Sequence, residues 1–253
     1  MSRLLEPQPV AAAASDPARI GRLSSRLRDT ARLADPSENP VVVDIPMEYD
    51  ARSERRMLWI DGVGGYLVCL ANDVTVGRAA PASDTRGPDI GLQADLASRH
   101  ATISRTEGRY VLKAHGPTTR NDKPVEESAV LEPGDVIQLG DATRLRFERP
   151  HALSATARLV IVSGHRTAPM ADGVLLMGES CVLGPQPHSH VRCPKWSQEV
   201  LLFKGKAQLQ CRSGSPVSIT RPGEPSEDTT GPAAIPPGAR IEAEDLCLSV
   251  EEV

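Results

Sequence analysis

From Leu58 onward, short apolar stretches alternate with turns that contain glycine, asparagine or aspartate. Within stretches such as LWI, YLVCL, VTVGR, HATIS and YVLKA, apolar and polar residues alternate as they do along strands with one buried face. The stretches AVL, VIQLG and LRFE follow at similar intervals. Short strands separated by glycine-containing turns are typical of an all-β sandwich. The pattern therefore predicts a β-sandwich over residues 57–150.

The same order of stretches returns after Leu159. RLVIVSG corresponds to MLWIDG, GESCVLGP to NDVTVGR, and IPPGARIEAEDLCLSVE to LEPGDVIQLGDATRLRFE. The glycines of corresponding turns are almost equally far apart in the two copies, at Gly77 and Gly134 and at Gly184 and Gly238. The repeat predicts a second β-sandwich over residues 157–253, and hence a mainly β fold with two tandem sandwiches.

Residues 1–56 follow a different pattern. Asp16-Pro17 is a typical helix start, because proline at the first helical position loses no hydrogen bond that the helix needs. Apolar residues then recur at helical spacing, at Ile20, Leu23, Leu27 and Ala31. We expect a helix over about residues 16–34 and a linker to residue 56. Such a helix either packs against the protein or binds a partner.

Composition limits the classes of function. The chain of 253 residues has a formal net charge of −4, which argues against binding to nucleic acid, because nucleic-acid-binding domains usually carry a basic excess. No apolar run approaches the roughly 18 residues that suggest a membrane span. The N-terminus lacks the pattern of a signal peptide. The five scattered cysteines are typical of reduced thiols, so we expect a cytoplasmic protein.

Three motifs of the first copy occur in a notable order: Gly77-Arg78 at the end of a stretch, Ser98-Arg99-His100 before the next, and LEPGDVIQLG further on. Together they resemble the forkhead-associated (FHA) domain, a β-sandwich whose loops bind phosphothreonine in partner proteins. The resemblance covers roughly residues 57–149. It implies that the domain is a binding module without a cofactor.

The resemblance also implies roles for individual residues. Arg78 offers a planar set of donors for phosphate oxygens. Ser98 adds a hydroxyl, and Arg99 raises the local positive potential. His100, together with Gly77, supports the loop rather than the ligand, and Gly134-Asp135 forms a turn in which Asp135 caps the backbone that follows. From the far loop, Thr118 and Asn121 complete the expected phosphopeptide site.

The sequence departs from the FHA pattern in two loops and in a long segment between residues 79 and 96. The family's serine lies three residues before the histidine, where this chain has Ala97, so Ser98 is one position late. Gly116-Pro117 stands where the family has its first Asn-Gly. Asn121 then either takes over that asparagine's contact with the ligand or serves only as a turn residue.

The second copy lacks the predicted ligand-binding residues. Pro185 follows Gly184 where Arg78 follows Gly77, and PKWSQE replaces the serine-histidine turn. Without a guanidinium, little offsets the cost of desolvating a phosphate dianion. We interpret this copy as a degenerate FHA-like domain that serves packing, dimerisation or an unmodified partner.

Cys181, His188, His190 and Cys193 are residues that zinc accepts as ligands, but Cys181 falls on a predicted strand and the spacing matches no familiar zinc motif. We therefore assign no metal site, although a metal-dependent protein is one alternative. No enzyme motif is present, because GVGG lies in a predicted hairpin and no Gly-x-Ser-x-Gly turn occurs.

The sequence therefore predicts a non-catalytic adaptor that binds phosphothreonine in a target of a Ser/Thr kinase, possessing no nucleic-acid or membrane partner. The alternative is a structural or protein-interaction scaffold whose FHA-like domains no longer bind phosphate. The displaced serine and the missing Asn-Gly are the observations that favour this alternative.

Overall fold

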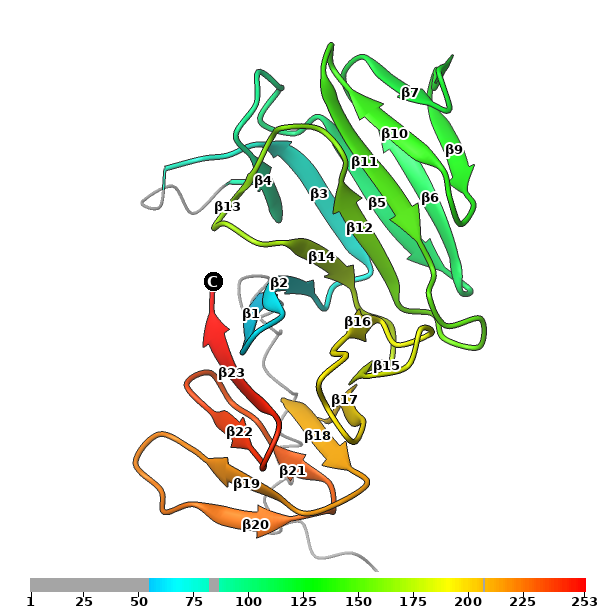
Figure 1. Ribbon diagram of the computed structural model, residues 1–253. Coiled ribbons are helices and arrows are strands. Elements are labelled where there is room, and N and C mark those ends of the chain that lie inside the picture. The colour runs from blue at the N-terminus through cyan, green and yellow to red at the C-terminus, as the bar shows by residue number, and fades with distance from the viewer. Residues whose placement is uncertain (1–54, 82–86, 207) are drawn as a thin grey trace, which may run out of the picture. The chain divides into compact units, whose positions relative to one another are not determined.

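The computed structural model describes residues 55–81, 87–206 and 208–253 (Figure 1). Every regular element in these residues is a strand, so the prediction of a mainly β fold is confirmed. The predicted helix over residues 16–34 lies outside the described residues, and it stays a prediction. In the described part of the chain, no helix has the length and apolar character needed to cross a membrane.

One sheet of six strands is formed mainly by the first half of the chain, residues 55–150. Its order is β13-β4-β3-β5-β6-β9. The strands are β3 (Asp73–Arg78), β4 (Ile90–Leu92), β5 (Ala101–Thr106), β6 (Arg109–Ala114), β9 (Ser128–Leu131) and β13 (Thr167–Ala168). The hairpin between β5 and β6 turns through Glu107 and Gly108, which both have positive φ, as tight two-residue hairpin turns require.

A sheet of twelve strands runs through both halves, in the order β20-β19-β22-β23-β1-β2-β14-β12-β11-β10-β7-β8. Six of its strands are β20 (Glu227–Thr229), β19 (Val217–Thr220), β22 (Arg240–Glu242), β23 (Cys247–Glu252), β1 (Arg55–Ile60) and β2 (Gly64–Cys69). The other six are β14 (Gly173–Leu176), β12 (Ala157–Ile161), β11 (Thr143–Glu148), β10 (Val136–Leu139), β7 (Thr118–Arg120) and β8 (Lys123–Pro124).

The third sheet has five strands and belongs to the second half, residues 157–253. Its order is β16-β15-β17-β18-β21. The strands are β15 (Ser180–Gly184), β16 (Val191–Arg192), β17 (Val200–Lys204), β18 (Leu209–Ser213) and β21 (Ala233–Ala234).

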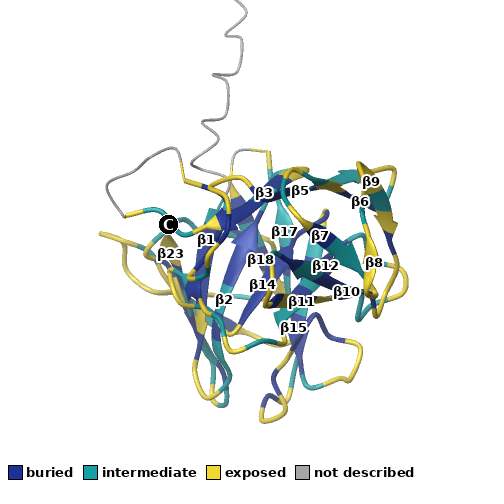
Figure 2. Cartoon of the chain, turned by 90° about the horizontal axis from the view of Figure 1, so that it is seen from above, coloured by how far each residue is buried: buried dark blue, intermediate teal, exposed yellow. Residues whose placement is uncertain are grey.

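The twelve-stranded sheet contributes to two hydrophobic cores, and its middle strands contribute to both. The first core lies against the six-stranded sheet and takes Leu67 of β2 and Val174 of β14. The second core lies against the five-stranded sheet and takes Val68 and Leu175 from the same two strands. Successive side chains of a strand point to opposite faces, so both faces of β2 and β14 are buried (Figure 2).

Strand pairing crosses from one half of the chain to the other. β1, from the first half, pairs with the last strand β23, with Leu58 opposite Val250. β12, from the second half, pairs with β11, with Leu159 opposite Phe147. β2 and β14 then pair in parallel at the centre of the sheet. The predicted boundary between residues 150 and 157 stays a prediction, but hydrogen-bonded pairing crosses it in both directions.

Strand order in the second half follows that of the first half. β15 pairs in parallel with β16 and antiparallel with β17, as β3 pairs with β4 and β5. A matching side-chain contact accompanies this order. Asp89 accepts a hydrogen bond from the backbone N–H of Thr75 at 2.7 Å, and His190 accepts one from the N–H of Val182 at 2.9 Å. These contacts fix the start of β4 and β16 in the same way.

Candidate binding site

The end of β3 lies directly against the loop that precedes β5. The backbone N–H of Arg78 donates a hydrogen bond to the carbonyl of Ala97 at 2.9 Å. A Cβ added to Gly77 would lie 2.2 Å from the carbonyl oxygen of Ser98, so only glycine permits this approach. Gly77 thus lies against the backbone of Ser98, and Arg78 is the next residue along the chain.

Three polar side chains are exposed at this junction, namely those of Arg78, Ser98 and Arg99. Within the described residues, none of the three side chains makes a hydrogen bond or an ion pair. Two guanidinium groups and one hydroxyl therefore remain free to donate to an anion. Guanidinium groups suit phosphate because their donors are planar and can bind two oxygens at once.

His100 follows Arg99 and is buried, with 3% of its surface exposed. Its Nδ1 accepts a hydrogen bond from the N–H of Ala97 at 3.3 Å, and its Nε2 lies 2.9 Å from the carbonyl oxygen of Pro117. The N–H of Gly140 lies 3.2 Å from the same Nε2. The N–H of Gly140 also donates to the carbonyl of Pro117, at 2.9 Å. His100 therefore joins the loop of Ser98 to the loop between β6 and β7.

Gly116 explains why the family's first asparagine is missing. A Cβ at this position would lie 2.7 Å from Cε1 of His100. No side chain fits there unless the buried ring moves. Thr118 follows on β7, is 6% exposed, and donates its hydroxyl to the carbonyl of Gly116 at 3.0 Å. The Thr118 hydroxyl thus holds the loop between β6 and β7, and its predicted contact with a ligand stays a prediction.

Asn121 lies at the opposite end of β7 from Pro117, in a turn where its φ is 51°. Its side-chain amide donates to Asp135 at 2.6 Å and accepts a hydrogen bond from the N–H of Val136 at 2.9 Å. Asp135 in turn accepts from the N–H of Glu132 at 2.8 Å, so it caps the backbone that precedes it rather than the backbone that follows. Of the two roles considered for Asn121, these contacts favour the turn residue.

One residue beside the site was missed by sequence reasoning. His115 is exposed on the loop between β6 and β7, and its Nε2 lies 2.8 Å from the hydroxyl of Thr102. Its backbone N–H donates to the carbonyl of His100 at 2.9 Å, which places it next to the supporting histidine. The only signal in the sequence was its position immediately before Gly116.

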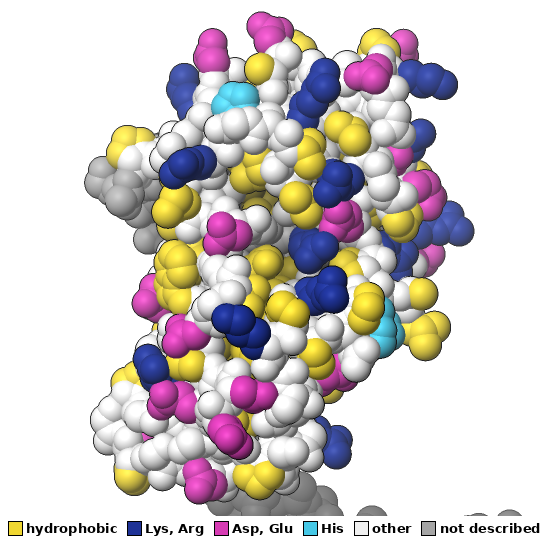
Figure 3. Space-filling view, viewed as in Figure 1, with side chains coloured by type: hydrophobic (Ala, Val, Ile, Leu, Met, Phe, Trp, Pro, Cys, Tyr) yellow, Lys and Arg dark blue, Asp and Glu magenta, His cyan; other side chains and the backbone are white. Residues whose placement is uncertain are grey.

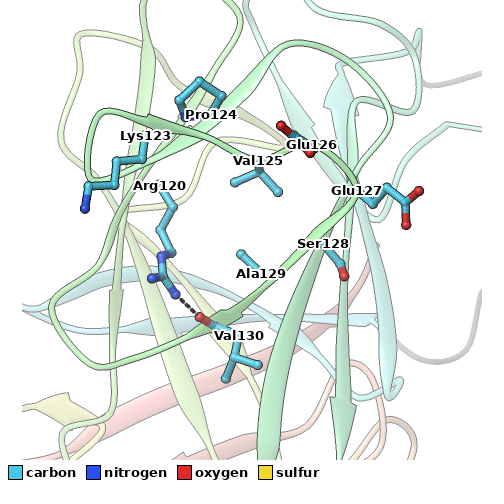
Figure 4. A pocket seen from close by; sticks show the side chains of 9 residues that line it. All are labelled: Arg120, Lys123, Pro124, Val125, Glu126, Glu127, Ser128, Ala129 and Val130. Atoms are coloured by element: carbon cyan, nitrogen blue, oxygen red, sulfur yellow. Dashed lines mark hydrogen bonds between the residues drawn. The ribbon is translucent and has the colours of Figure 1, made fainter.

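A hollow of about 690 Å³ lies between the hairpin β7–β8 and the edge strand β9 (Figure 4). It is lined by Arg120 and by residues 123–130. Arg120 donates to the carbonyl of Val130 across the hollow, and its Nη1 lies 3.8 Å from Asp135. Arg120 is therefore held by the edge of the sandwich and contributes little free charge to the Arg78 region.

The four residues considered for zinc are held in other ways. Cys181 and Cys193 are buried in the second core, where burial raises the pKa of both thiols, that of Cys193 to about 12. Nδ1 of His190 is occupied by the N–H of Val182, and the ring of His188 packs against His151 at 5.4 Å. Among the described residues, no group of His, Cys, Asp or Glu is arranged to hold a metal ion.

Charged side chains of both signs cover the face shown in Figure 3. Asp and Glu gather over the lower strands, while Lys and Arg gather beside a hollow with hydrophobic walls in the middle of this face (Figure 3). Two arginines of the protein are paired with one carboxylate, because Glu148 forms ion pairs with Arg146 at 2.8 Å and with Arg158 at 2.6 Å. The unpaired guanidinium of Arg78 differs from these arginines in having no carboxylate beside it among the described residues.

Comparison with known proteins gives a family for part of the chain. Residues 74–140 match the family model of the FHA domain. A solved structure described as "Rv0020c_FHA Structure" shares 28% sequence identity, over 34% of this chain and 84% of that chain, with a TM-score of 0.23. No curated protein matched the chain. The family match includes Gly77, Arg78, Ser98 and His100. The match places an FHA domain at residues 74–140, and FHA domains in general are β-sandwich modules that bind phosphothreonine-containing peptides.

Proposed function

We propose that this protein is a non-catalytic adaptor that binds a phosphothreonine of its partner through Arg78 and Ser98. Arg99 adds positive charge at the same place, and His100 holds the loop in position. The partner is a protein modified by a Ser/Thr kinase. The adaptor works in the cytoplasm, which suits its free thiols.

One observation carries this proposal. The backbone N–H of Arg78 bonds to Ala97, the residue before Ser98, and within the described residues the side chains of Arg78 and Ser98 have no internal partner. Arginine side chains near carboxylates usually form ion pairs, as Arg146 and Arg158 do here. An exposed guanidinium beside a free hydroxyl and a glycine that admits close backbone approach is suited to a dianionic phosphate.

The second half of the chain has no such group in the corresponding place. Gly184 ends β15 as Gly77 approaches the end of β3, but Pro185 follows it. Proline brings neither a charge nor a backbone N–H. We therefore assign phosphate binding to the first half alone, and we regard the second half as a degenerate FHA-like copy.

A scaffold that binds its partners without phosphate is the second candidate. It is favoured by the contacts of Gly116 and Asn121, which leave the family's two asparagine positions without a free amide. In that case the ligand's main chain loses one anchoring contact. The two candidates differ in a single measurable quantity, the affinity that a phosphate group adds.

The test compares binding of a phosphothreonine peptide library with that of the same library without phosphate. Hydrogen bonds to charged groups contribute roughly 1.5–3 kcal/mol, so Arg78→Ala should weaken phosphopeptide binding by about ten- to a hundredfold. Arg109→Ala is the matched control, because Arg109 is exposed at the far end of the same sandwich, next to the β5–β6 turn. Equal binding of both libraries, or equal effects of the two variants, would show that the protein is a scaffold that binds its partners without phosphate.

A further inference from the structure

The first core is completed by residues that come from the second half of the chain. Ala157 and Leu159 of β12, and Val174 and Leu176 of β14, are all buried in it at 2% exposure or less. β12 provides the strand next to β11, and β14 follows β12 in the sheet. The family match over residues 74–140 contains none of these strands.

The connection between β12 and β14 also reaches the sheet that carries Arg78. Within it, β13 extends the six-stranded sheet by pairing with β4, with Thr167 opposite Leu92 (Figure 1). The N–H of Gln93 donates to the carbonyl of Arg166 at 2.8 Å. Gln93 opens the loop that leads to Ser98, so the second half holds this loop at its beginning.

Internal contacts keep this connection in place. The side chain of Thr167 is fully buried, and its hydroxyl accepts a hydrogen bond from the N–H of Ala171 at 2.7 Å. A Cβ at Gly91 would lie 3.1 Å from the carbonyl oxygen of Ala168, which shows how closely β13 approaches β4. β13 is therefore packed against the sheet as one of its strands.

The first half supplies its own first hairpin in return. Leu58 and Ile60 of β1, and Val68 of β2, are buried in the second core at 2% exposure or less. β1 occupies the place beside β23 that β12 occupies beside β11. Each core thus contains side chains from the first hairpin of the other half, while the opposite face of that hairpin, such as Leu67 of β2, stays in the core of its own half.

We infer that the two halves exchange their first hairpins, and that the second half acts as an intramolecular partner that builds a wall of the ligand-binding sandwich. Residues 157–177 form this wall. They fix β4 and the start of the Ser98 loop, so ligand affinity depends on a half of the chain that has no phosphate-binding residues. The dependence of ligand affinity on the second half rests on the proposed function, whereas the exchange of hairpins does not.

The exchange is tested by cutting the full-length chain between the halves. Leu153 lies in the connection between β11 and β12 and is 93% exposed, so a protease site introduced there is accessible. After cleavage, the two fragments should elute together under native conditions and separate in denaturant. Separation under native conditions would overturn the inference.

A disulfide pair identifies which strands hold the fragments together. Arg146 of β11 lies opposite Val160 of β12, so the double variant Arg146→Cys, Val160→Cys should link the two fragments after oxidation. Without exchange, Val160 would lie opposite Ser249, which here faces Trp59. The control Val160→Cys, Ser249→Cys should therefore not form a disulfide. A disulfide in the control and none in the first variant contradicts the exchange.

The coupling to ligand binding is tested in the intact chain with Thr167→Ala, which removes the hydroxyl that holds the β13 connection. Phosphopeptide affinity should fall several-fold while the circular dichroism spectrum is retained, and Arg109→Ala should leave the affinity unchanged. An unchanged affinity in Thr167→Ala contradicts the coupling. If the wild-type protein binds no phosphopeptide, the proposed function fails, and the cross-linking result still decides the exchange.

Discussion

At the scale of single residues, the loops around Arg78 contain polar side chains of two kinds. Among the described residues, the side chains of Arg78 and Ser98 have no hydrogen-bond partner. The side chains of His100 and Thr118 bond to neighbouring backbone, and that of Asn121 bonds to the carboxylate of Asp135 and to the N–H of Val136. The motif Gly-Arg marks Arg78 in the sequence, and the supporting role of the buried His100, like the predicted ligand contacts, stays a prediction. The role of Asn121 depends on residues 14 and 15 positions away, Asp135 and Val136, and no local pattern in the sequence shows that these are its neighbours.

Asn121→Ala should lower stability rather than remove a ligand contact. The substitution leaves a carboxylate oxygen of Asp135 and the N–H of Val136 without their partner, which costs about 1–3 kcal/mol of unfolding free energy. Urea unfolding measures this loss. Phosphopeptide affinity under native conditions should stay within about twofold of the wild type. A large loss of affinity at unchanged stability would instead assign Asn121 to the ligand.

His190 should make stability depend on pH. Burial, together with the nearby His151 and Arg158, lowers the pKa of His190 from 6.5 to about 4. Between these two values the unfolded chain binds a proton that the folded protein excludes, so the free energy of unfolding should decrease as the pH falls from about 6.5 to about 4. The loss is roughly 3 kcal/mol at most.

Urea unfolding at pH 7 and pH 4.5 measures the effect of His190. The variant His190→Gln keeps an acceptor for the N–H of Val182 but cannot titrate, so it should lose this part of the pH dependence. The same pH dependence in wild type and variant would assign the effect to other groups.

At the scale of elements, hydrophobic alternation identified the strands but not their partners. The apolar positions of LWI and RLVIV were predicted to be buried in their own halves, whereas Leu58 lies in the second core and Leu159 in the first. The two hairpins have similar apolar patterns, so each fits either core. Periodicity shows which face of a strand is buried, and it contains no information on which of two similar sheets receives that strand.

Truncating either of these two leucines should therefore destabilise mainly the core of the other half. Leu58→Ala and Leu159→Ala should each reduce the free energy of unfolding by about 2–5 kcal/mol, because both side chains are fully or almost fully buried. Native-state hydrogen exchange locates the damage. Leu58→Ala should speed exchange in β17 and β18 more than in β5 and β6, and Leu159→Ala should do the reverse. Effects confined to each residue's own half would contradict the observed pairing.

At the scale of the whole described structure, one sheet joins both cores, so they should unfold together. Cysteine thiols report on this because Cys69 lies in the first core and Cys181, Cys193 and Cys211 lie in the second. All four are buried, and burial raises the pKa of each thiol, that of Cys211 to about 11. Buried, protonated thiols react slowly with alkylating reagents.

Pulse alkylation across a urea series should modify Cys69 and the second-core cysteines at one common midpoint. Mass spectrometry of the digested protein separates the individual sites. Cys247, which is only partly buried, should react at lower urea and serves as an internal control for reagent activity. Different midpoints for Cys69 and Cys211 would indicate two independent unfolding units.

Pairing between β1 and β23 joins residues at nearly opposite ends of the described chain, such as Arg56 and Glu252. A ribosome releases β1 long before it synthesises β23, so the first hairpin emerges with one apolar face that has nothing to cover it. The second core cannot close until β23 has been synthesised, and contacts between such distant residues form slowly. For this protein, the period on the ribosome is when aggregation threatens most, and it is then that a chaperone would be of greatest use.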